Sequence, residues 1–250
     1  MDNLIVIKIG GTASDTLTES FFEQIHFWQS EGKKLIIIHG GGHYISSMMT
    51  QLNVPVCQKN GLRVTTDEVL KISQMVLIGQ VQPMITSRFQ QEGLRAVGLN
   101  TSSAKIILGE YLDKELLGHV GRVTKIQTTL LEDLLDKDYI PVVAPLGMTT
   151  SDNWLNINAD ESACHIASAL NAEALYLLTD VAGILKSGDF LEEIALTEID
   201  QLIEEETITG GMIPKVKSAE KAIRDGVNTV YITNSILKAG TSILGKERVL

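Results

Sequence analysis

Two glycine-rich turns, each directly after a run of aliphatic residues, are the stretches of this sequence best suited to binding an anion. Lys8 stands near the end of the first run and is followed by Gly10 and Gly11. The second run leads into three glycines at 40–42. Backbone amides exposed by such turns, and by the helix N-termini that follow them, bind phosphate groups. The Lys8 ammonium group would supply the positive charge that a phosphorylated ligand needs.

Other interpretations of these turns remain open. A lysine at the end of a strand can extend to solvent, and a tight strand-to-helix turn needs glycine for backbone reasons alone. Neither turn matches G-x-G-x-x-G and the sequence contains no G-x-x-x-x-G-K-[ST], so a Rossmann dinucleotide site and a P-loop lose their main support. His39 has no second histidine at metal-ligand spacing, so we interpret it as structural.

A polar segment at 156–160 could add a carboxylate to this chemistry. Asn156 and Asn158 would point the same way from an extended chain. Asp160 would then fall in the first turn of a helix, where its carboxylate could hold catalytic lysines in place. The alternative is that Asn158 or Asp160 is simply the N-cap of that helix.

Lys215 is the second candidate cation. It follows Pro214, a residue typical of the first turn of a helix. The helix dipole disfavours a lysine there, which suggests that an anion lies nearby. Lys217 is about 200° further round the helix, so only one of the two lysines can face a cleft. A solvated surface position remains the alternative for both, and more strongly for Lys217.

The elements that must position these residues alternate between strands and helices. The aliphatic runs at 4–9 and 35–38 are each followed by a helical pattern, at 18–30 and about 44–52. Two such units in tandem predict a parallel sheet with right-handed crossovers, in one α/β domain or in two lobes around a cleft. We expect further helices at about 66–79, 81–92, 130–137, 160–170, 198–206 and 212–225, further strands at 96–99, 139–145, 174–179, 228–233 and 241–244, and a hairpin at 117–123.

Composition excludes several classes of protein. The formal net charge of −10 argues against a nucleic-acid partner or an anionic membrane surface. The longest apolar runs are too short to span a bilayer, and the N-terminus lacks the pattern of a signal peptide. The two cysteines, Cys57 and Cys164, form no C-x-x-C pair, which fits a reduced, cytoplasmic setting.

Taken together, seven motifs make the chain resemble the amino acid kinase family, in the branch that phosphorylates N-acetyl-L-glutamate. They are KIGG at 8–11, HGGG at 39–42, KNGLRVT at 59–65, LGHVG at 117–121, NINAD at 156–160, LLTDVAGIL at 177–185 and GGMIPKV at 210–216. The glycine turns mark the family at large, whereas NGLRVT, GHVG and NxNAD mark the branch. The resemblance covers nearly the whole chain.

The resemblance implies an α/β fold, a three-layer αβα sandwich around a mainly parallel central sheet, of the carbamate kinase-like type with two lobes. The renewed alternation of strands and helices places the boundary near Asn171. Residues 1–171 would form the N-terminal lobe, which binds acetylglutamate and mediates dimerisation. Residues 172–250 would form the C-terminal lobe, which binds ATP. The enzyme would transfer the γ-phosphoryl group of ATP to the side-chain carboxylate of N-acetyl-L-glutamate, the second step of arginine biosynthesis. Mg²⁺ would be carried by ATP and not by a metal site of the protein.

The resemblance also implies roles for individual residues. Lys8 and Lys215 would stabilise the transferring phosphoryl group from opposite lobes, and Asp160 would orient both. Four residues would hold acetylglutamate: Gly41, Gly42, Arg63 and Asn156. The nucleotide would contact Gly10, Gly11, Asp180, Val181, Ala182, Gly183, Ile184, Leu185, Thr207, Ile208 and Thr209.

The sequence departs from part of the family and leaves alternatives. The family's arginine-inhibited hexamers carry an extra helix before the first strand, whereas only three residues precede Leu4 here, so we expect a homodimer without arginine feedback. A related kinase with another acidic substrate is the first alternative. A non-catalytic ligand sensor is the second, although such a sensor has no need of the charged trio formed by the two lysines and Asp160. His165 and the acidic run at 204–206 are interpreted as structural or as solvated surface.

Overall fold

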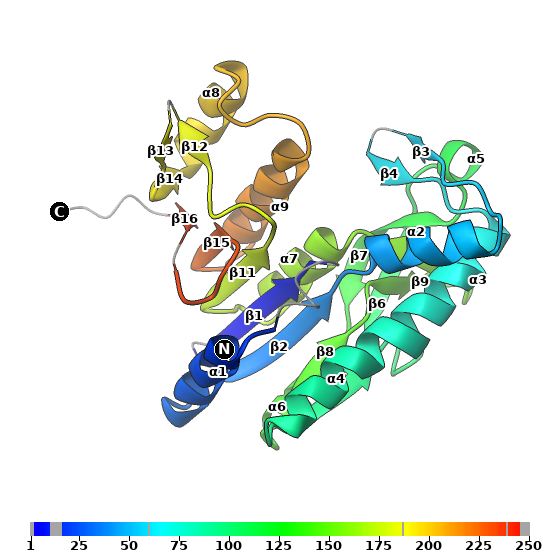
Figure 1. Ribbon diagram of the computed structural model, residues 1–250, viewed down its shortest axis with the longest axis horizontal. Coiled ribbons are helices and arrows are strands. Elements are labelled where there is room, and N and C mark those ends of the chain that lie inside the picture. The colour runs from blue at the N-terminus through cyan, green and yellow to red at the C-terminus, as the bar shows by residue number, and fades with distance from the viewer. Residues whose placement is uncertain (1–2, 11–16, 60, 187, 239, 246–250) are drawn as a thin grey trace.

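An eight-stranded sheet forms the centre of the computed structural model, which describes residues 3–10, 17–59, 61–186, 188–238 and 240–245 (Figure 1). In spatial order its strands are β14 (Glu193–Ala195), β16 (Thr241–Leu244), β15 (Thr229–Thr233), β11 (Ala174–Leu178), β1 (Leu4–Ile9), β2 (Lys34–His39), β8 (Ile140–Val143) and β5 (Ala96–Leu99). Within the described residues β15 and β16 are antiparallel, and the other neighbours in this sheet are parallel. The mainly parallel sheet expected from the sequence is confirmed.

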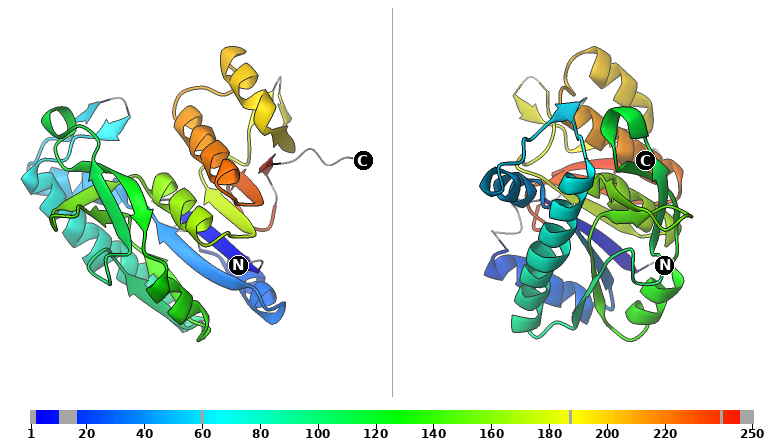
Figure 2. Two further views of the ribbon diagram at one scale, coloured as in Figure 1. Left: turned by 180° about the vertical axis from the view of Figure 1, so that it is seen from behind. Right: turned by 90° about the vertical axis from the view of Figure 1, so that its right-hand side faces the viewer.

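Helices cover both faces of this sheet, which makes the expected three-layer sandwich (Figures 1 and 2). One face is covered by α1 (Glu19–Ser30), α2 (Gly42–Gln51), α3 (Asp67–Val76) and α4 (Gln82–Gln91). The other is covered by α6 (Thr129–Leu135), α7 (Ala159–Ala169), α8 (Ile199–Glu204) and α9 (Met212–Arg224). Among the described helices, none is long and apolar enough to cross a membrane.

The alternation of side chains along β1 decides which layer Lys8 faces. Leu4 and Val6 pack in the core that includes α7 and α9, whereas Ile7 and Ile9 pack in the core that includes α1 and α2. Because successive side chains of a strand point to opposite faces, Lys8 follows Leu4 and Val6 toward α7 and α9. β1 also pairs with β11, so one sheet runs across the division expected between residues 171 and 172.

Smaller units adjoin the sheet. A closed barrel, as far as the structure describes the chain, is formed by β10 (Trp154–Ile157), β7 (Val120–Ile126), β6 (Ile107–Tyr111) and β9 (Leu146–Met148). Two short hairpins are formed by β3 (Gln58–Lys59) with β4 (Leu62–Arg63) and by β12 (Leu185–Lys186) with β13 (Asp189–Phe190). The barrel and the first hairpin lie on the side of β2 and β8, and the second hairpin lies near α8 (Figure 1).

The helix break expected at Gly79 is wrong. α3 continues through a π-helical turn, η2 (Leu77–Val81), directly into α4. A π-helical turn accommodates an extra residue without ending the helix, and such turns are frequent at functional sites. This one packs on the second glycine turn, because a Cβ atom placed on Gly41 would lie 2.5 Å from Leu77 Cδ2.

The hairpin expected at 117–123 is also wrong. Leu117 ends a short helix, α5 (Lys114–Leu117), and the antiparallel pair is β6 with β7, on either side of that helix. Gly118 has φ +69°, and a Cβ atom there would lie 2.3 Å from the carbonyl oxygen of Thr65. This glycine therefore serves a close approach between two segments and not the reversal of a hairpin. The other expected elements are present, with ends that are shifted.

Candidate active site

The ammonium groups of Lys8 and Lys215 lie against the two oxygens of one carboxylate, that of Asp160. Lys8 Nζ is 2.8 Å from Asp160 Oδ1, an ion pair without the geometry of a hydrogen bond. Lys215 Nζ donates a hydrogen bond to Asp160 Oδ2 at 2.5 Å. The three side chains are only 10%, 11% and 16% exposed, in the order Lys8, Lys215 and Asp160. The structure therefore brings together the three residues that the sequence singled out.

Three elements deliver these groups. Lys8 comes from the end of β1, Asp160 from the first turn of α7 and Lys215 from the first turn of α9. Asn158 is the N-cap of α7, because its side chain accepts hydrogen bonds from the amides of Asp160 and Glu161. This decides between the two capping alternatives and leaves the Asp160 carboxylate to the lysines.

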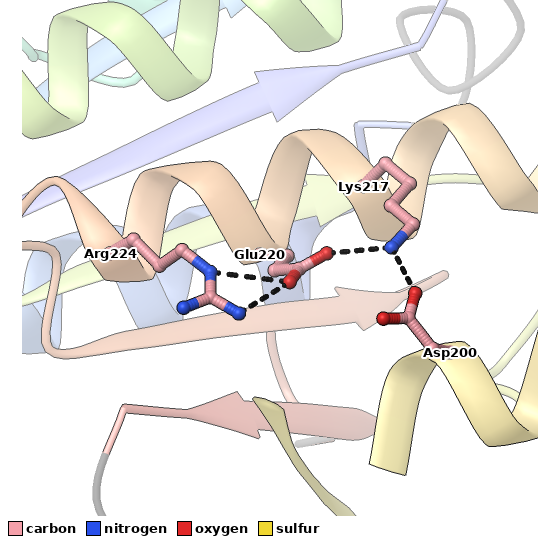
Figure 3. Close-up of polar contacts among 4 residues, drawn as sticks. All are labelled: Asp200, Lys217, Glu220 and Arg224. Atoms are coloured by element: carbon pink, nitrogen blue, oxygen red, sulfur yellow. Dashed lines mark hydrogen bonds and ion pairs between the residues drawn. The ribbon is translucent and has the colours of Figure 1, made fainter. Parts of the chain in front are cut away.

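Lys217 faces a different partner, as its position on the helix predicts. Its ammonium group lies 2.5 Å from Asp200 of α8 and 3.0 Å from Glu220 of its own helix. Figure 3 shows it between these two carboxylates. Arg224 donates to the same Glu220 at 2.8 Å. Lys217 therefore ties α9 to α8 on the protein surface, and Lys215 is the lysine of this pair that reaches Asp160.

The charge balance of the trio favours an anion. Burial lowers the pKa of Lys8, and the nearby Lys215 lowers it further, while Asp160 opposes both effects. Burial would raise the pKa of Asp160, but the two lysines outweigh it and hold that pKa below its usual value. With both lysines protonated, the trio carries one surplus positive charge where solvent has little access, and a phosphate group would compensate for it.

The glycine turns border the trio. Gly10 follows β1, and a Cβ atom built on it would lie 3.8 Å from Lys8 Nζ. Gly41 is the N-cap residue of α2 and makes no side-chain cap, so the first amides of that helix, from Gly42 on, are available to a ligand. Gly11 lies outside the described residues.

A cavity of about 260 Å³ lies next to the second glycine turn. All four residues implied for substrate binding line it: Gly41, Gly42, Arg63 and Asn156. Its lining continues to Asn158 and Ala159, directly before Asp160 in the chain. The cavity and the charged trio are therefore neighbours.

Arg63 lies along the first turns of α2 at this cavity. Its Nη2 donates to the Gly42 carbonyl oxygen at 2.9 Å and to Ser46 Oγ at 2.7 Å, and its Nη1 lies 3.2 Å from Met49 Sδ. Burial lowers the pKa of Arg63. A partly desolvated guanidinium fork in a cavity is suited to binding a carboxylate through two hydrogen bonds.

Ser46, Thr65 and Glu161 support the site, although sequence reasoning missed them. Thr65 is fully buried and accepts a hydrogen bond from Asn156 Nδ2 at 3.0 Å. Glu161 Oε1 accepts the Val123 amide at 2.8 Å, which ties the first turn of α7 to β7. Each of the three lies close to a motif in the sequence, which could have indicated its role. Ser46 is one helical turn after the second glycine run, Thr65 ends NGLRVT, and Glu161 follows NINAD.

Comparison with known proteins decides the family. The sequence profile of the Amino acid kinase family matches residues 3–234. The chain belongs to the amino acid kinase family. An acetylglutamate kinase of Listeria welshimeri is 52% identical over 249 residues, which cover 100% of both chains. The resemblance expected from the motifs is thus confirmed.

Solved structures support the fold of this amino acid kinase family member. The crystal structure of smu.665 from Streptococcus mutans UA159 is similar with a TM-score of 0.93 and 39% identity, over 98% of this chain and 100% of that one. Carbamate kinase from Giardia lamblia bound to AMP-PNP has a TM-score of 0.73 and 19% identity, over 98% and 99% of the two chains. The second likeness concerns the fold alone, and it confirms the carbamate kinase-like architecture.

Besides Gly10 and Gly11, the residues implied for nucleotide binding fall into two segments of this amino acid kinase. Residues 180–185 follow β11, which runs parallel to β1, so they leave the sheet at the edge where Lys8 lies. Residues 207–209 lead into α9, which carries Lys215 in its first turn. The second segment is thus connected directly to a helix that positions the trio, and the first follows the strand that pairs with β1.

Side chains in these two segments differ in what they can offer a nucleotide. Val181 is 39% exposed, whereas Ile184 and Ile208 are buried in the core and can offer only their backbones. The Ile184 amide already donates to Thr241 Oγ1 at 2.8 Å. Gly183 packs on the same hydroxyl, since a Cβ atom there would lie 2.9 Å from it.

Proposed function

We propose that the protein transfers the γ-phosphoryl group of ATP to the side-chain carboxylate of N-acetyl-L-glutamate. The products would be N-acetyl-L-glutamyl 5-phosphate and ADP, in the second step of arginine biosynthesis. The observation that carries the proposal is the contact of both Lys8 and Lys215 with Asp160, beside a cavity lined by Arg63 and Asn156. Full-length identity of 52% to an acetylglutamate kinase supports the choice of substrate.

This chemistry needs cations more than it needs an acid or a base. The attacking carboxylate is already ionised at pH 7, so no group has to remove a proton from it. Two anions must approach each other instead, and negative charge is spread over the phosphoryl oxygens in the transition state. In this proposal Lys8 and Lys215 stabilise that charge, and Asp160 holds their ammonium groups in place before the substrates bind.

The cavity would hold acetylglutamate from two sides. The Arg63 guanidinium group pairs with a carboxylate of the substrate, and the Asn156 amide contacts it from β10. The backbone of Gly41 and Gly42 closes the cavity where the α2 N-terminus begins, and the positive end of that helix favours an anionic ligand.

ATP would bring Mg²⁺ as part of the substrate complex, where the cation neutralises phosphate charge. Asp160 is already engaged by two lysines, and the described residues contain no group of three or more His, Cys, Asp or Glu side chains that could hold a metal. The nucleotide itself would contact residues 10–11, 180–185 and 207–209.

We also propose the lobe assignment and assembly implied by the resemblance. Residues 1–171 would bind acetylglutamate and mediate formation of a homodimer, and residues 172–250 would bind ATP. Exposed apolar side chains on the outer helices support the homodimer: Met75 of α3 is 56% exposed and Met84 of α4 is 36% exposed. A cytoplasmic location fits the use of ATP and two free cysteines.

Release of ADP, measured in a coupled assay, tests the proposed activity. N-acetyl-L-glutamate should be preferred over L-glutamate, L-aspartate and carbamate by about 100-fold or more in kcat/KM. Preference for one of the other acids would assign the protein to a different substrate within the family. No ADP release with any of them, together with intact ATP binding, would favour a non-catalytic ligand sensor.

A further inference from the structure

We propose that Thr65 sets the orientation of the Asn156 side-chain amide and thereby selects substrates with an amide N–H. Thr65 is not among the residues that line the cavity, whereas Asn156 is. Thr65 is therefore a positioning and specificity-determining residue that acts through Asn156. This inference rests on the proposed function, because it concerns how the cavity distinguishes an N-acylated amino acid from its analogues.

The hydrogen bonds of the Thr65 hydroxyl allow only one orientation of the Asn156 side-chain amide. A hydroxyl group has a single proton to donate, and Thr65 Oγ1 donates it to the carbonyl oxygen of Arg63 at 2.9 Å. That carbonyl can only accept. Toward Asn156, which lies 3.0 Å away, the Thr65 hydroxyl must therefore accept, and Asn156 must present its Nδ2.

The carbonyl oxygen of the Asn156 side chain, Oδ1, is then turned away from Thr65. Among the described residues, no hydrogen-bond donor reaches Asn156 Oδ1, and Asn156 is half-buried in the wall of the cavity. An unpaired carbonyl oxygen in the wall of a cavity can accept a hydrogen bond from a ligand there. N-acetylglutamate at neutral pH carries two carboxylates and an acetyl carbonyl, which are acceptors, and a single donor, its amide N–H. The cavity oxygen and that N–H are thus complementary.

Thr65 itself is held in place by backbone contacts. It is fully buried, its amide donates to the Leu117 carbonyl oxygen at 2.9 Å, and its own carbonyl accepts the His119 amide at 2.7 Å. The amide of Asn156 in turn donates to the His119 carbonyl oxygen at 2.9 Å. Both partners are therefore anchored to the same segment, so the hydroxyl and the amide cannot easily move apart.

Thr65→Val tests the inference, because valine keeps the shape of the side chain and removes both the donor and the acceptor. Thr65→Ser keeps the hydroxyl and is the matched control. Each variant is assayed with N-acetyl-L-glutamate and with 2-acetoxyglutarate, in which an ester oxygen replaces the N–H. Circular dichroism and thermal unfolding check that the variants fold. Thr65→Cys, with a thiol that is a weak hydrogen-bond partner, provides a graded second variant.

The wild-type protein should prefer the amide over the ester by about 10- to 100-fold in kcat/KM. In Thr65→Val the Asn156 amide is free to turn its NH₂ group into the cavity. The ratio of kcat/KM for the amide to kcat/KM for the ester should therefore fall to about threefold or less. The KM for acetylglutamate should rise about 10-fold, with little change in the KM for ATP. Thr65→Ser should retain the wild-type preference, and Thr65→Cys should be intermediate.

An unchanged amide-to-ester preference in a folded Thr65→Val protein would overturn the inference. An equal loss of activity toward both substrates would do the same, since it would assign Thr65 a purely structural role. Failure of the proposed function gives a separate result, because the wild-type protein would then not phosphorylate acetylglutamate at all.

Discussion

Lys215 Nζ and Asp160 Oδ2 lie 2.5 Å apart, although 55 positions separate the two residues in the chain. The contact joins the first turns of α7 and α9, two helices of the same layer. It also explains how α9 tolerates a lysine in its first turn, where the helix dipole is unfavourable to a cation. The carboxylate compensates for that cost and holds the ammonium group beside Lys8.

Lys8→Ala and Lys215→Ala should each lower kcat by about 10²–10³-fold, because each removes a cation that stabilises the transition state. Lys217→Ala is the matched control on the same helix, since Lys217 pairs with Asp200 and not with Asp160. It should retain nearly the wild-type kcat. Steady-state ADP release measures all three. Near-normal turnover in both site variants would refute the roles assigned to the two lysines.

Asp160→Asn should shift the pH dependence of the reaction. Burial and Lys215 lower the pKa of Lys8, and Asp160 is the group that raises it. Loss of the carboxylate therefore lowers this pKa further, and the alkaline limb of the profile should move to lower pH. The pH profile of kcat/KM for ATP reports the free enzyme and is the measurement to make. An alkaline limb at the wild-type position would contradict the proposed coupling.

Arg63→Lys should raise the KM for acetylglutamate by about 10-fold or more, because an ammonium group cannot replace the two-pronged contact of a guanidinium group with a carboxylate. The KM for ATP should change much less. Steady-state kinetics with each substrate varied in turn separates the two effects. Equal increases in both KM values would count against a place for Arg63 in the acetylglutamate cavity.

Gly41→Ala should destabilise the fold by about 1–3 kcal/mol, because its Cβ would lie 2.5 Å from Cδ2 of Leu77, a buried residue of the π-helical turn. Gly42→Ala is the paired control for stability, since a Cβ atom there meets nothing within 4 Å. Urea denaturation monitored by circular dichroism measures both. Equal stability of the two variants would show that the close packing of Gly41 is not required.

Acid should destabilise the protein through His39. This side chain is fully buried, and burial lowers its pKa to about 4 from 6.5. Between these values the unfolded chain takes up a proton that the folded protein excludes, so stability is fully present above pH 6.5 and falls as the pH drops toward 4. The loss should reach up to about 3 kcal/mol.

His39→Asn is the control for this effect, because an asparagine amide can replace the bond from His39 Nδ1 to the Gly40 carbonyl oxygen at 3.0 Å and does not titrate. Free energies of unfolding in urea, measured from pH 7 to pH 4.5, should fall less steeply for this variant. Parallel curves for the two proteins would assign the acid sensitivity to other groups.

Local sequence patterns predicted most of the helices and strands, because these elements depend mainly on residues that are close together in the chain. The aliphatic run of β1 and the apolar spacing of α1 lie where expected. The prediction failed where packing overrides local preference. Gly79 suggests a helix end by itself, but the chain passes through it in a π-helical turn that buries Leu77 and Val81.

The sequence by itself determined the family, the layered α/β fold and the identity of the charged residues, since motifs and periodicity are properties of short stretches. Only the tertiary structure decided that Asn158 caps α7 while Asp160 turns to Lys8 and Lys215. It likewise decided that Asn156 Nδ2 donates a hydrogen bond to Thr65 Oγ1 across 91 positions. Such pairings arise from the three-dimensional packing of strands and helices, and no local pattern encodes which distant side chains will meet.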